Sequence, residues 1–95
     1  MPTRLTDATI AQELSALDGW HRAGDAIVRT FTFPTFADGI AFVGRVATLA
    51  DAMDHHPDID IRYTAVTLAL ATHSAGGITE LDFELARKAD EVVSL

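Results

Sequence analysis

Apolar and polar positions follow two different periods along this chain, and together these predict three helices and four strands. Apolar residues recur every three or four positions in 7–17, 35–54 and 80–93, as on the buried face of a helix. They recur at every second position in the hairpin-like segment 19–33, and again within 58–71, as in half-buried strands. The predicted order of elements is therefore α-β-β-α-β-β-α.

Polar and turn-forming residues mark the boundaries of the first three elements. Thr6 is a candidate N-cap of the first helix, which Asp18 and Gly19 should end. A turn near Gly24 and Asp25 should join the first two strands into a hairpin. These signals are typical of short, well-defined elements.

The two later helices have equally clear boundaries. The middle helix should end around Asp54–His55, because Pro57 disfavours a helical backbone in the residue before it. Thr79 and Asp82 form a candidate capping box at the start of the last helix. The predicted buried stripe of the middle helix consists of Phe36, Ile40, Val43, Ala47, Ala50 and Met53, widened by Phe42, Val46 and Leu49.

Strands joined by hairpins pair antiparallel, so we predict an α+β fold. It has a four-stranded antiparallel sheet with three helices packed on one face. The 95 residues suit a single domain, residues 1–95, with one core. The other face of the sheet should lie open. Apolar surface exposed in this way on so small a chain favours oligomerisation.

Composition narrows the class of protein. Hydrophobic residues make up 48% of the chain and charged residues 22%, which is typical of a folded domain. The net charge of −7 opposes a phosphate backbone, so we expect no nucleic-acid binding. The absence of cysteine excludes disulfides, thiol nucleophiles and Cys-ligated zinc. With no apolar leader and no run of 18 apolar residues, we expect a cytoplasmic protein without a membrane partner.

Three of the four histidines stand at the ends of predicted elements. His55 and His56 are adjacent, so they cannot share one face of a helix or strand and cannot both fill the core. His73 ends the last predicted strand. Asp51 lies four residues before His55, where helical spacing would place its carboxylate against that imidazole. Taken singly, these features could be a solvated pair, a surface histidine and, for Asp82, a simple helix cap.

Taken together, these positions resemble the signature of the pterin-4a-carbinolamine dehydratase family. That signature is an acidic residue, three spacers, His-His-Pro, an aromatic residue, a histidine and an aspartate. In this chain it reads Asp51, His55, His56, Pro57, Tyr63, His73 and Asp82. The segment "THSAGGIT" at 72–79 adds to the likeness, which covers nearly the whole chain.

The resemblance implies an enzyme that dehydrates 4a-hydroxytetrahydropterin to quinonoid dihydropterin during tetrahydropterin recycling. That substrate is the by-product of aromatic amino-acid hydroxylases. The reaction needs an acid near the leaving hydroxyl and a base near N5, which imidazoles can supply near neutral pH without a metal or other cofactor. The resemblance also implies a homodimer or homotetramer, with a pterin-dependent aromatic amino-acid hydroxylase as functional partner.

The same resemblance assigns roles to individual residues. The pterin would contact two segments, consisting of Asp54, His55 and His56 and of Ala71, Thr72, His73 and Ser74. We expect His56 to be the principal proton donor to the leaving hydroxyl and His55 an auxiliary acid or base. His73 would act as a base or orienting group on the pterin side. The supporting residues would be Asp51, Pro57 and Asp82.

Two alternatives stay open on the sequence alone. Three histidines and a carboxylate could hold zinc, although adjacent histidines diverge and the spacing matches no common zinc motif. A non-enzymatic protein-binding or dimerisation-cofactor module is the second, because animal members of the family also act as dimerisation cofactors of a transcription factor. The presence of all three histidines favours the enzyme.

Overall fold

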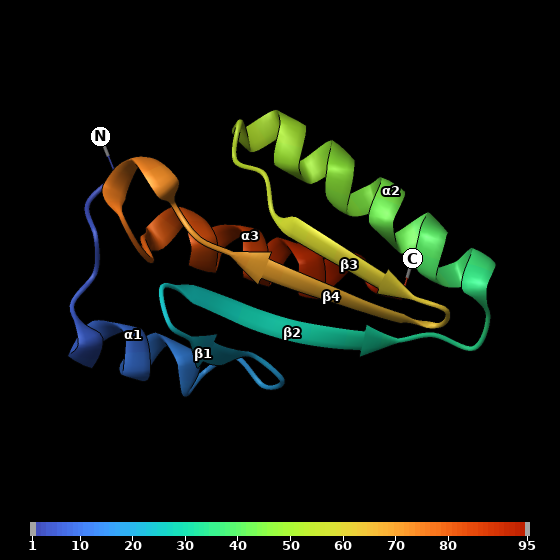
Figure 1. The fold of residues 1–95 in the computed structure, drawn as a ribbon, viewed down its shortest axis with the longest axis horizontal. Coiled ribbons are helices and arrows are strands. Elements are labelled where there is room, and N and C mark those ends of the chain that lie inside the picture. Colours follow the sequence, from blue (N-terminus) through green and yellow to red (C-terminus); the bar gives the residue numbers. More distant parts are fainter. Residues whose placement is uncertain (1, 95) are drawn as a thin grey trace.

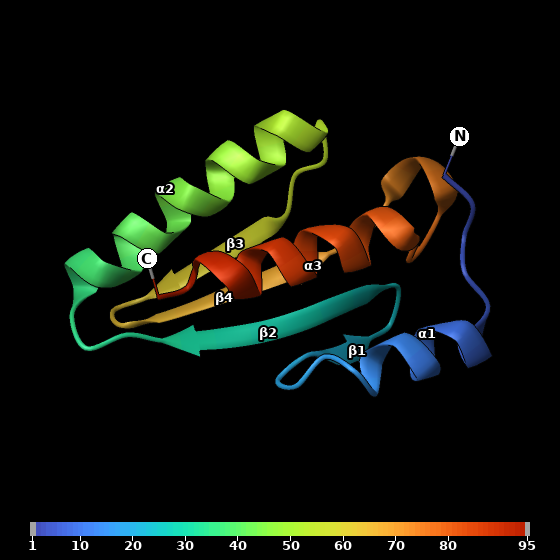
Figure 2. The same ribbon diagram turned by 180° about the vertical axis from the view of Figure 1, so that it is seen from behind.

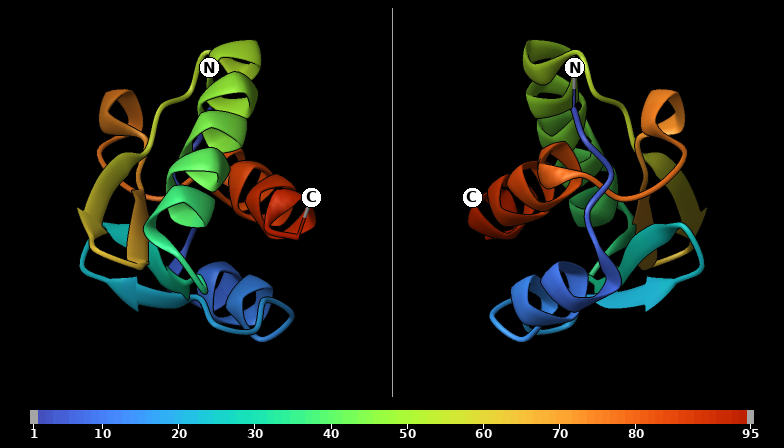
Figure 3. Two further views of the ribbon diagram at one scale, coloured as in Figure 1. Left: turned by 90° about the vertical axis from the view of Figure 1, so that its right-hand side faces the viewer. Right: turned by 90° about the vertical axis from the view of Figure 1, so that its left-hand side faces the viewer.

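A computed structural model describes residues 2–94 and confirms the predicted order of elements. The four strands form one antiparallel sheet in the order β1-β2-β4-β3, so β1 and β3 are its edges (Figure 1). The three helices lie on one side of it (Figure 3). The elements are α1 (Asp7–Leu14), β1 (His21–Ala23), β2 (Ala26–Thr32), α2 (Phe36–Met53), β3 (Asp58–Arg62), β4 (Ala65–Leu70), a 3₁₀ turn η1 (His73–Ala75) and α3 (Glu80–Val92).

The core fills the space between the sheet and the helices. Figure 2 looks at the helix-covered side, where α3 runs over the middle of the sheet and α2 along the β3 edge. Phe42 of α2 is fully buried, with its ring 4.7 Å from that of Phe31 and 5.1 Å from that of Phe33. Alternate residues of β4 face the same core, as the period-two pattern predicted; they are Val66, Leu68 and Leu70.

Two helix predictions need correction. The first helix ends at Leu14 rather than at Asp18, and Leu17 is buried from the turn that follows. The buried face of α2 centres on Phe42 and Val46, whereas three members of the predicted stripe are exposed: Phe36 to 49%, Ile40 to 41%, and Ala47. The reason is that α3 packs beside α2 and turns the apolar stripe of α2 partly outward. Arg45 of α2 reaches the last turn of α3, with its Nε donating to the carbonyl of Val92 at 2.8 Å.

The exposed large apolar residues do not lie on the open face of the sheet, contrary to the prediction. That face carries small and polar side chains, including Thr30 and Thr67, whose hydroxyls lie 2.8 Å apart. Ile59 and Ile61 pair with Leu68 and Val66, so they lie on the helix-covered face, but at the β3 edge where cover is incomplete. The exposed large apolar residues are Phe36, Ile40, Ile59, Ile61 and Tyr63.

Two carboxylic acids meet where α1 packs near the start of α3. Oε2 of Glu13 is buried with no donor within reach, although Glu80 lies beside it. A carboxyl group facing another carboxylate gains a hydrogen bond only if it keeps its proton. The contact with Glu80, together with burial, therefore raises the pKa of Glu13. Glu80 stays ionised, because the hydrogen bond from Glu13 and that from Arg87, 2.8 Å away, lower its pKa.

This pair should make stability depend on pH. Because the folded-state pKa of Glu13 is raised, its contribution is fully present below the ordinary glutamate pKa and is lost as pH rises through the raised value. Glu13→Gln keeps a donor for Glu80 and removes the titration. We therefore expect it to stabilise the fold by about 0.5–1 kcal/mol at pH 7 and by almost nothing at pH 4.

Urea denaturation of both proteins at the two pH values measures this difference. Glu84→Gln is the control, since within residues 2–94 the one ion pair of Glu84 is with Lys88, at 4.0 Å and in contact with solvent. A Glu13→Gln protein that is less stable at pH 7 than the unmodified chain would contradict the raised pKa of Glu13.

Candidate active site

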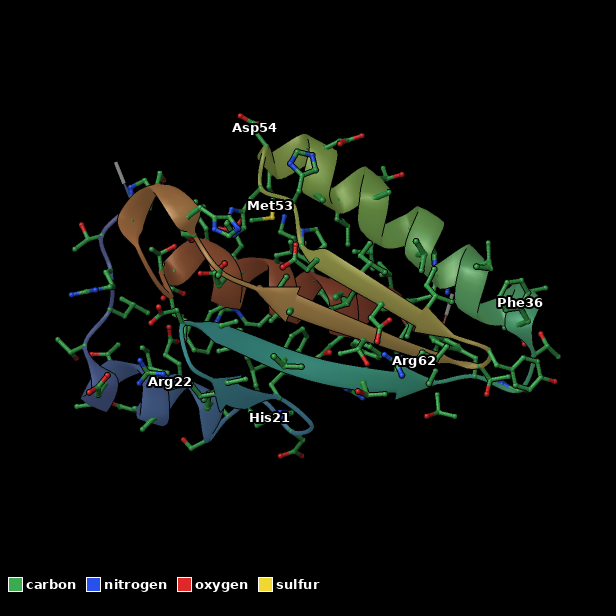
Figure 4. The ribbon with its side chains drawn as sticks, viewed as in Figure 1. His21, Arg22, Phe36, Met53, Asp54 and Arg62 are labelled. Carbon is green, nitrogen blue, oxygen red and sulfur yellow. The ribbon has the colours of Figure 1, made fainter. Side chains whose placement is uncertain are left out.

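The site begins where α2 ends. Asp54 caps the helix in the left-handed conformation, with φ of 50°. The N–H of His55 donates back to the carbonyl of Ala50 at 3.0 Å, which closes the last turn. Aspartate tolerates the left-handed region better than most residues because its short side chain can bond locally. Figure 4 shows Asp54 pointing away from the protein at this end of α2. The chain changes direction here, so His55 does not continue the helical stripe.

His55 turns inward and binds the first turn of α3. Its Nε2 lies 2.6 Å from Oδ1 of Asp82. Asp82 is fully buried and His55 is 9% exposed, so water screens this pair very little. The contact joins two segments that are 27 residues apart in the sequence. It therefore holds the end of α2 against the start of α3.

The second oxygen of Asp82 is also satisfied. Its Oδ2 accepts the backbone N–H of Thr79 at 2.8 Å and the hydroxyl of Thr72 at 2.9 Å. The predicted capping box of Thr79 and Asp82 is present, so the helix-cap interpretation of Asp82 is confirmed. The same carboxylate also binds a histidine, so capping is only part of what it does. A negative charge in the first turn of a helix interacts favourably with the positive end of the helix dipole.

Asp51 does not contact His55, and the prediction that it would is wrong. Its Oδ1 lies 2.9 Å from Nε2 of His56 instead. The left-handed residue at Asp54 ends the helical spacing on which the prediction depended, so His56 rather than His55 lies next to Asp51. The His56 and Asp51 side chains are 59% and 78% exposed, so their pairing adds little to stability.

His73 lies beyond the last strand. β4 ends at Leu70, and His73 begins η1 rather than ending the strand as predicted. Its side chain is exposed and helps to line a cleft of about 360 Å³ at one end of the sheet. The cleft is lined by Asp25, Ala26, Asp58, Ala71, Thr72, His73, Gly76 and Gly77. Asp58, two residues after His56, was not predicted there, because alternation alone placed it on a solvated strand face.

Asp82 is the group through which the two predicted substrate-binding segments meet. It binds His55 in one segment and Thr72 in the other. His56 stays on the solvent side of this contact. His21 lies on β1, well away from the end of α2 at Asp54 (Figure 4). The three histidines of the candidate site are thus one buried imidazole, His55, and two exposed ones, His56 and His73.

Sequence reasoning missed the role of Thr79 and of the Thr72 hydroxyl. Thr72 is only 4% exposed, and its hydroxyl lies 2.7 Å from that of Thr79. The capping box gave a signal for Thr79, but only as a helix start. Within residues 2–94, no three histidine or carboxylate side chains gather as a set of metal ligands. The same residues include no helix both long and apolar enough to cross a bilayer.

Comparison with known proteins defines the class of this fold and site. The family model described as pterin 4 alpha carbinolamine dehydratase matches residues 3–92. Two relatives, each named as a candidate pterin-4-alpha-carbinolamine dehydratase, are 55% and 58% identical to this chain. The first, from Roseiflexus sp. strain RS-1, covers 98% of this chain and 100% of its own. The second, from Thermomicrobium roseum, covers 96% and 98%.

Solved structures agree. A transcriptional coactivator/pterin dehydratase from Brucella melitensis superposes with a TM-score of 0.93 at 39% identity, over 97% of this chain and all of the other. A pterin dehydratase-like RuBisCO assembly factor of the α-carboxysome shares the fold, with a TM-score of 0.68 at 24% identity over 80% of this chain and 90% of its own. The chain belongs to the pterin 4 alpha carbinolamine dehydratase family.

Proposed function

We propose that this protein dehydrates 4a-hydroxytetrahydropterin to quinonoid dihydropterin and so serves tetrahydropterin recycling. The observation that carries the proposal is the pair of histidines at the end of α2, each held by its own carboxylate. Family membership supports the substrate class, since relatives more than half identical over almost the whole chain are named for this activity. The cleft beside His73 offers a place for a flat heterocycle next to an imidazole.

The reaction removes the C4a hydroxyl as water and the proton from N5. His56, exposed and oriented by Asp51, is the principal donor of a proton to the leaving oxygen. His73, on the wall of the cleft, is the base or orienting group on the pterin side. His55 is the auxiliary acid or base. The pterin contacts the Asp54–His56 segment and a second segment formed by Ala71, Thr72, His73 and Ser74. Pro57 supports the first segment, because it disfavours a helical backbone at His56.

The proposal is tested by generating the carbinolamine with a pterin-dependent aromatic amino-acid hydroxylase and following its decay by ultraviolet absorbance. Added protein should accelerate the decay in proportion to its concentration, whereas heat-denatured protein should not. A folded protein that leaves the decay unchanged would instead favour the alternative, a protein-binding module without catalysis.

We also expect the reaction to need no bound metal, because proton transfer between imidazoles and the pterin completes it. Protein treated with a chelator and then dialysed should keep its full rate in the same assay. A rate that disappears on this treatment and returns only with added zinc would refute the histidine mechanism.

We propose that the protein assembles as a homodimer or homotetramer. The supporting feature is the α2–β3 strip, formed by the exposed residues Phe36, Ile40, Ile59 and Ile61. Two of them lie on β3, an edge strand with unpaired backbone groups, so a second copy could cover apolar surface and strand edge together.

Light scattering at micromolar concentration should therefore give two or four times the mass of 10.2 kDa. Ile59→Lys places a charge on the α2–β3 strip and should shift the protein to monomer. Thr30→Lys places the same charge on the open sheet face and should not. A monomeric unmodified chain, or equal effects of the two variants, would show that the strip is not the interface.

A further inference from the structure

The hydrogen bonds around Asp82 all have the same direction, from donor to acceptor. The number of protons available on each group fixes that direction. The hydroxyl of Thr72 lies 2.9 Å from Oδ2 of Asp82 and 2.7 Å from the hydroxyl of Thr79. A hydroxyl has only one proton to give. Thr72 gives its proton to the carboxylate, so Thr79 must donate to Thr72. The Thr79 oxygen accepts in turn from the backbone N–H of Leu81, 3.2 Å away.

Every donor in this group therefore points towards Asp82. Oδ2 receives the Thr72 hydroxyl and the Thr79 N–H, and the carboxylate stands in the first turn of α3. As a carboxylate, Asp82 has only acceptors to offer. Its other oxygen, Oδ1, meets Nε2 of His55 at 2.6 Å. Nε2 must then carry a proton.

This leaves the other ring nitrogen of His55. Within residues 2–94, Nδ1 of His55 makes no hydrogen bond. Among these residues, the one fully buried side-chain oxygen or nitrogen without a hydrogen-bond partner is Oε2 of Glu13, so Nδ1 is not fully buried. Nδ1 therefore reaches solvent, although His55 is 9% exposed overall. Since Nε2 is committed to Asp82, Nδ1 is the ring atom free to exchange a proton with a ligand.

We propose that Thr72 and Thr79 are positioning residues, whose hydroxyls form a one-way chain that holds His55 as its Nε2–H tautomer and leaves Nδ1 to act on the pterin. Nδ1 accepts a proton from the ligand, the ring becomes a cation beside ionised Asp82, and the proton then passes from Nδ1 to water. The role towards pterin rests on the proposed function, whereas the tautomer rests on the hydrogen bonds alone.

The test determines the tautomer directly, by long-range ¹H–¹⁵N spectra recorded at a pH at which the histidine rings are neutral. In the unmodified protein, we expect Nε2 of His55 protonated and Nδ1 bare. Thr72→Val keeps the shape and removes one donor from Oδ2. It should give a mixture of tautomers and lower kcat by about ten- to a hundredfold.

Two further variants separate positioning from folding. Thr72→Ser restores the hydroxyl and should restore both the spectrum and kcat. Thr30→Val breaks the exposed Thr30–Thr67 hydroxyl pair, of almost the same length at 2.8 Å, and should change neither. If Thr72→Val does not fold, the spectra of the unmodified protein and of Thr72→Ser still show whether Nε2 of His55 carries the proton.

A bare Nε2 in the unmodified protein overturns the inference, as does a Thr72→Val protein with unchanged spectrum and kcat. The spectrum requires no turnover. An inactive protein with the expected tautomer would therefore refute the proposed function and leave the hydrogen-bond chain standing, whereas an active protein with the wrong tautomer would refute this inference alone.

Discussion

Replacing His56 with alanine is expected to slow dehydration of 4a-hydroxytetrahydropterin by about two to four orders of magnitude, the usual loss when a general acid is removed. The fold should barely change, because the His56 side chain is 59% exposed and its only side-chain partner within residues 2–94 is the equally solvated Asp51. The assay rate and the midpoint of thermal unfolding, measured on the same preparation, check both halves of the expectation.

His21→Ala is the matched control, since His21 is an exposed histidine on β1, far from the site. It should leave both the rate and the melting temperature unchanged. A His56→Ala protein that keeps its rate would remove His56 from the reaction. One that unfolds would show that the residue supports the fold rather than the chemistry.

The largest loss of stability is expected at Asp82. Asp82→Ala leaves three donors without their acceptor in a fully buried place, namely the Thr79 N–H, the Thr72 hydroxyl and Nε2 of His55. The Thr79 N–H is the donor of the Asp82 half of the capping box, while Thr79 itself remains the N-cap of α3. The unsatisfied buried donors should lower the free energy of unfolding by about 3–5 kcal/mol.

Asp51→Ala is the comparison, because Asp51 binds a histidine at a similar distance but in solvent. It should change the free energy of unfolding by no more than about 0.5 kcal/mol. Urea denaturation of the two variants against the unmodified chain measures the difference. Equal losses in the two variants would mean that burial does not distinguish the two histidine–carboxylate pairs, and the expectation for Asp82 would then be wrong.

Local signals predicted the framework of this site well. Pro57 correctly limited α2, and the spacing of Thr79 and Asp82 correctly marked the start of α3. Both are effects of neighbouring residues on the backbone, which a sequence displays directly. The order of strands and their alternation followed from the same kind of local pattern.

Other features depended on contacts that no local pattern contains. A single left-handed residue, Asp54, redirects the chain after α2, so that Asp51 pairs with His56 and His55 pairs with Asp82. Helical spacing could not foresee this, because it applies only while the helix continues. The outward turn of Phe36 likewise depends on how α3 packs against α2, which is decided by the whole core.

The central claim is that the exposed histidines of this chain, and not the fold alone, dehydrate the pterin carbinolamine. The most direct measurement compares the decay of freshly generated 4a-hydroxytetrahydropterin in buffer, with the unmodified protein, and with a His56→Ala, His73→Ala double variant. Both replaced side chains are exposed, so the variant should stay folded. We expect rapid decay with the unmodified protein and decay at the buffer rate with the variant. Equal acceleration by both proteins, or acceleration by neither, would contradict the claim.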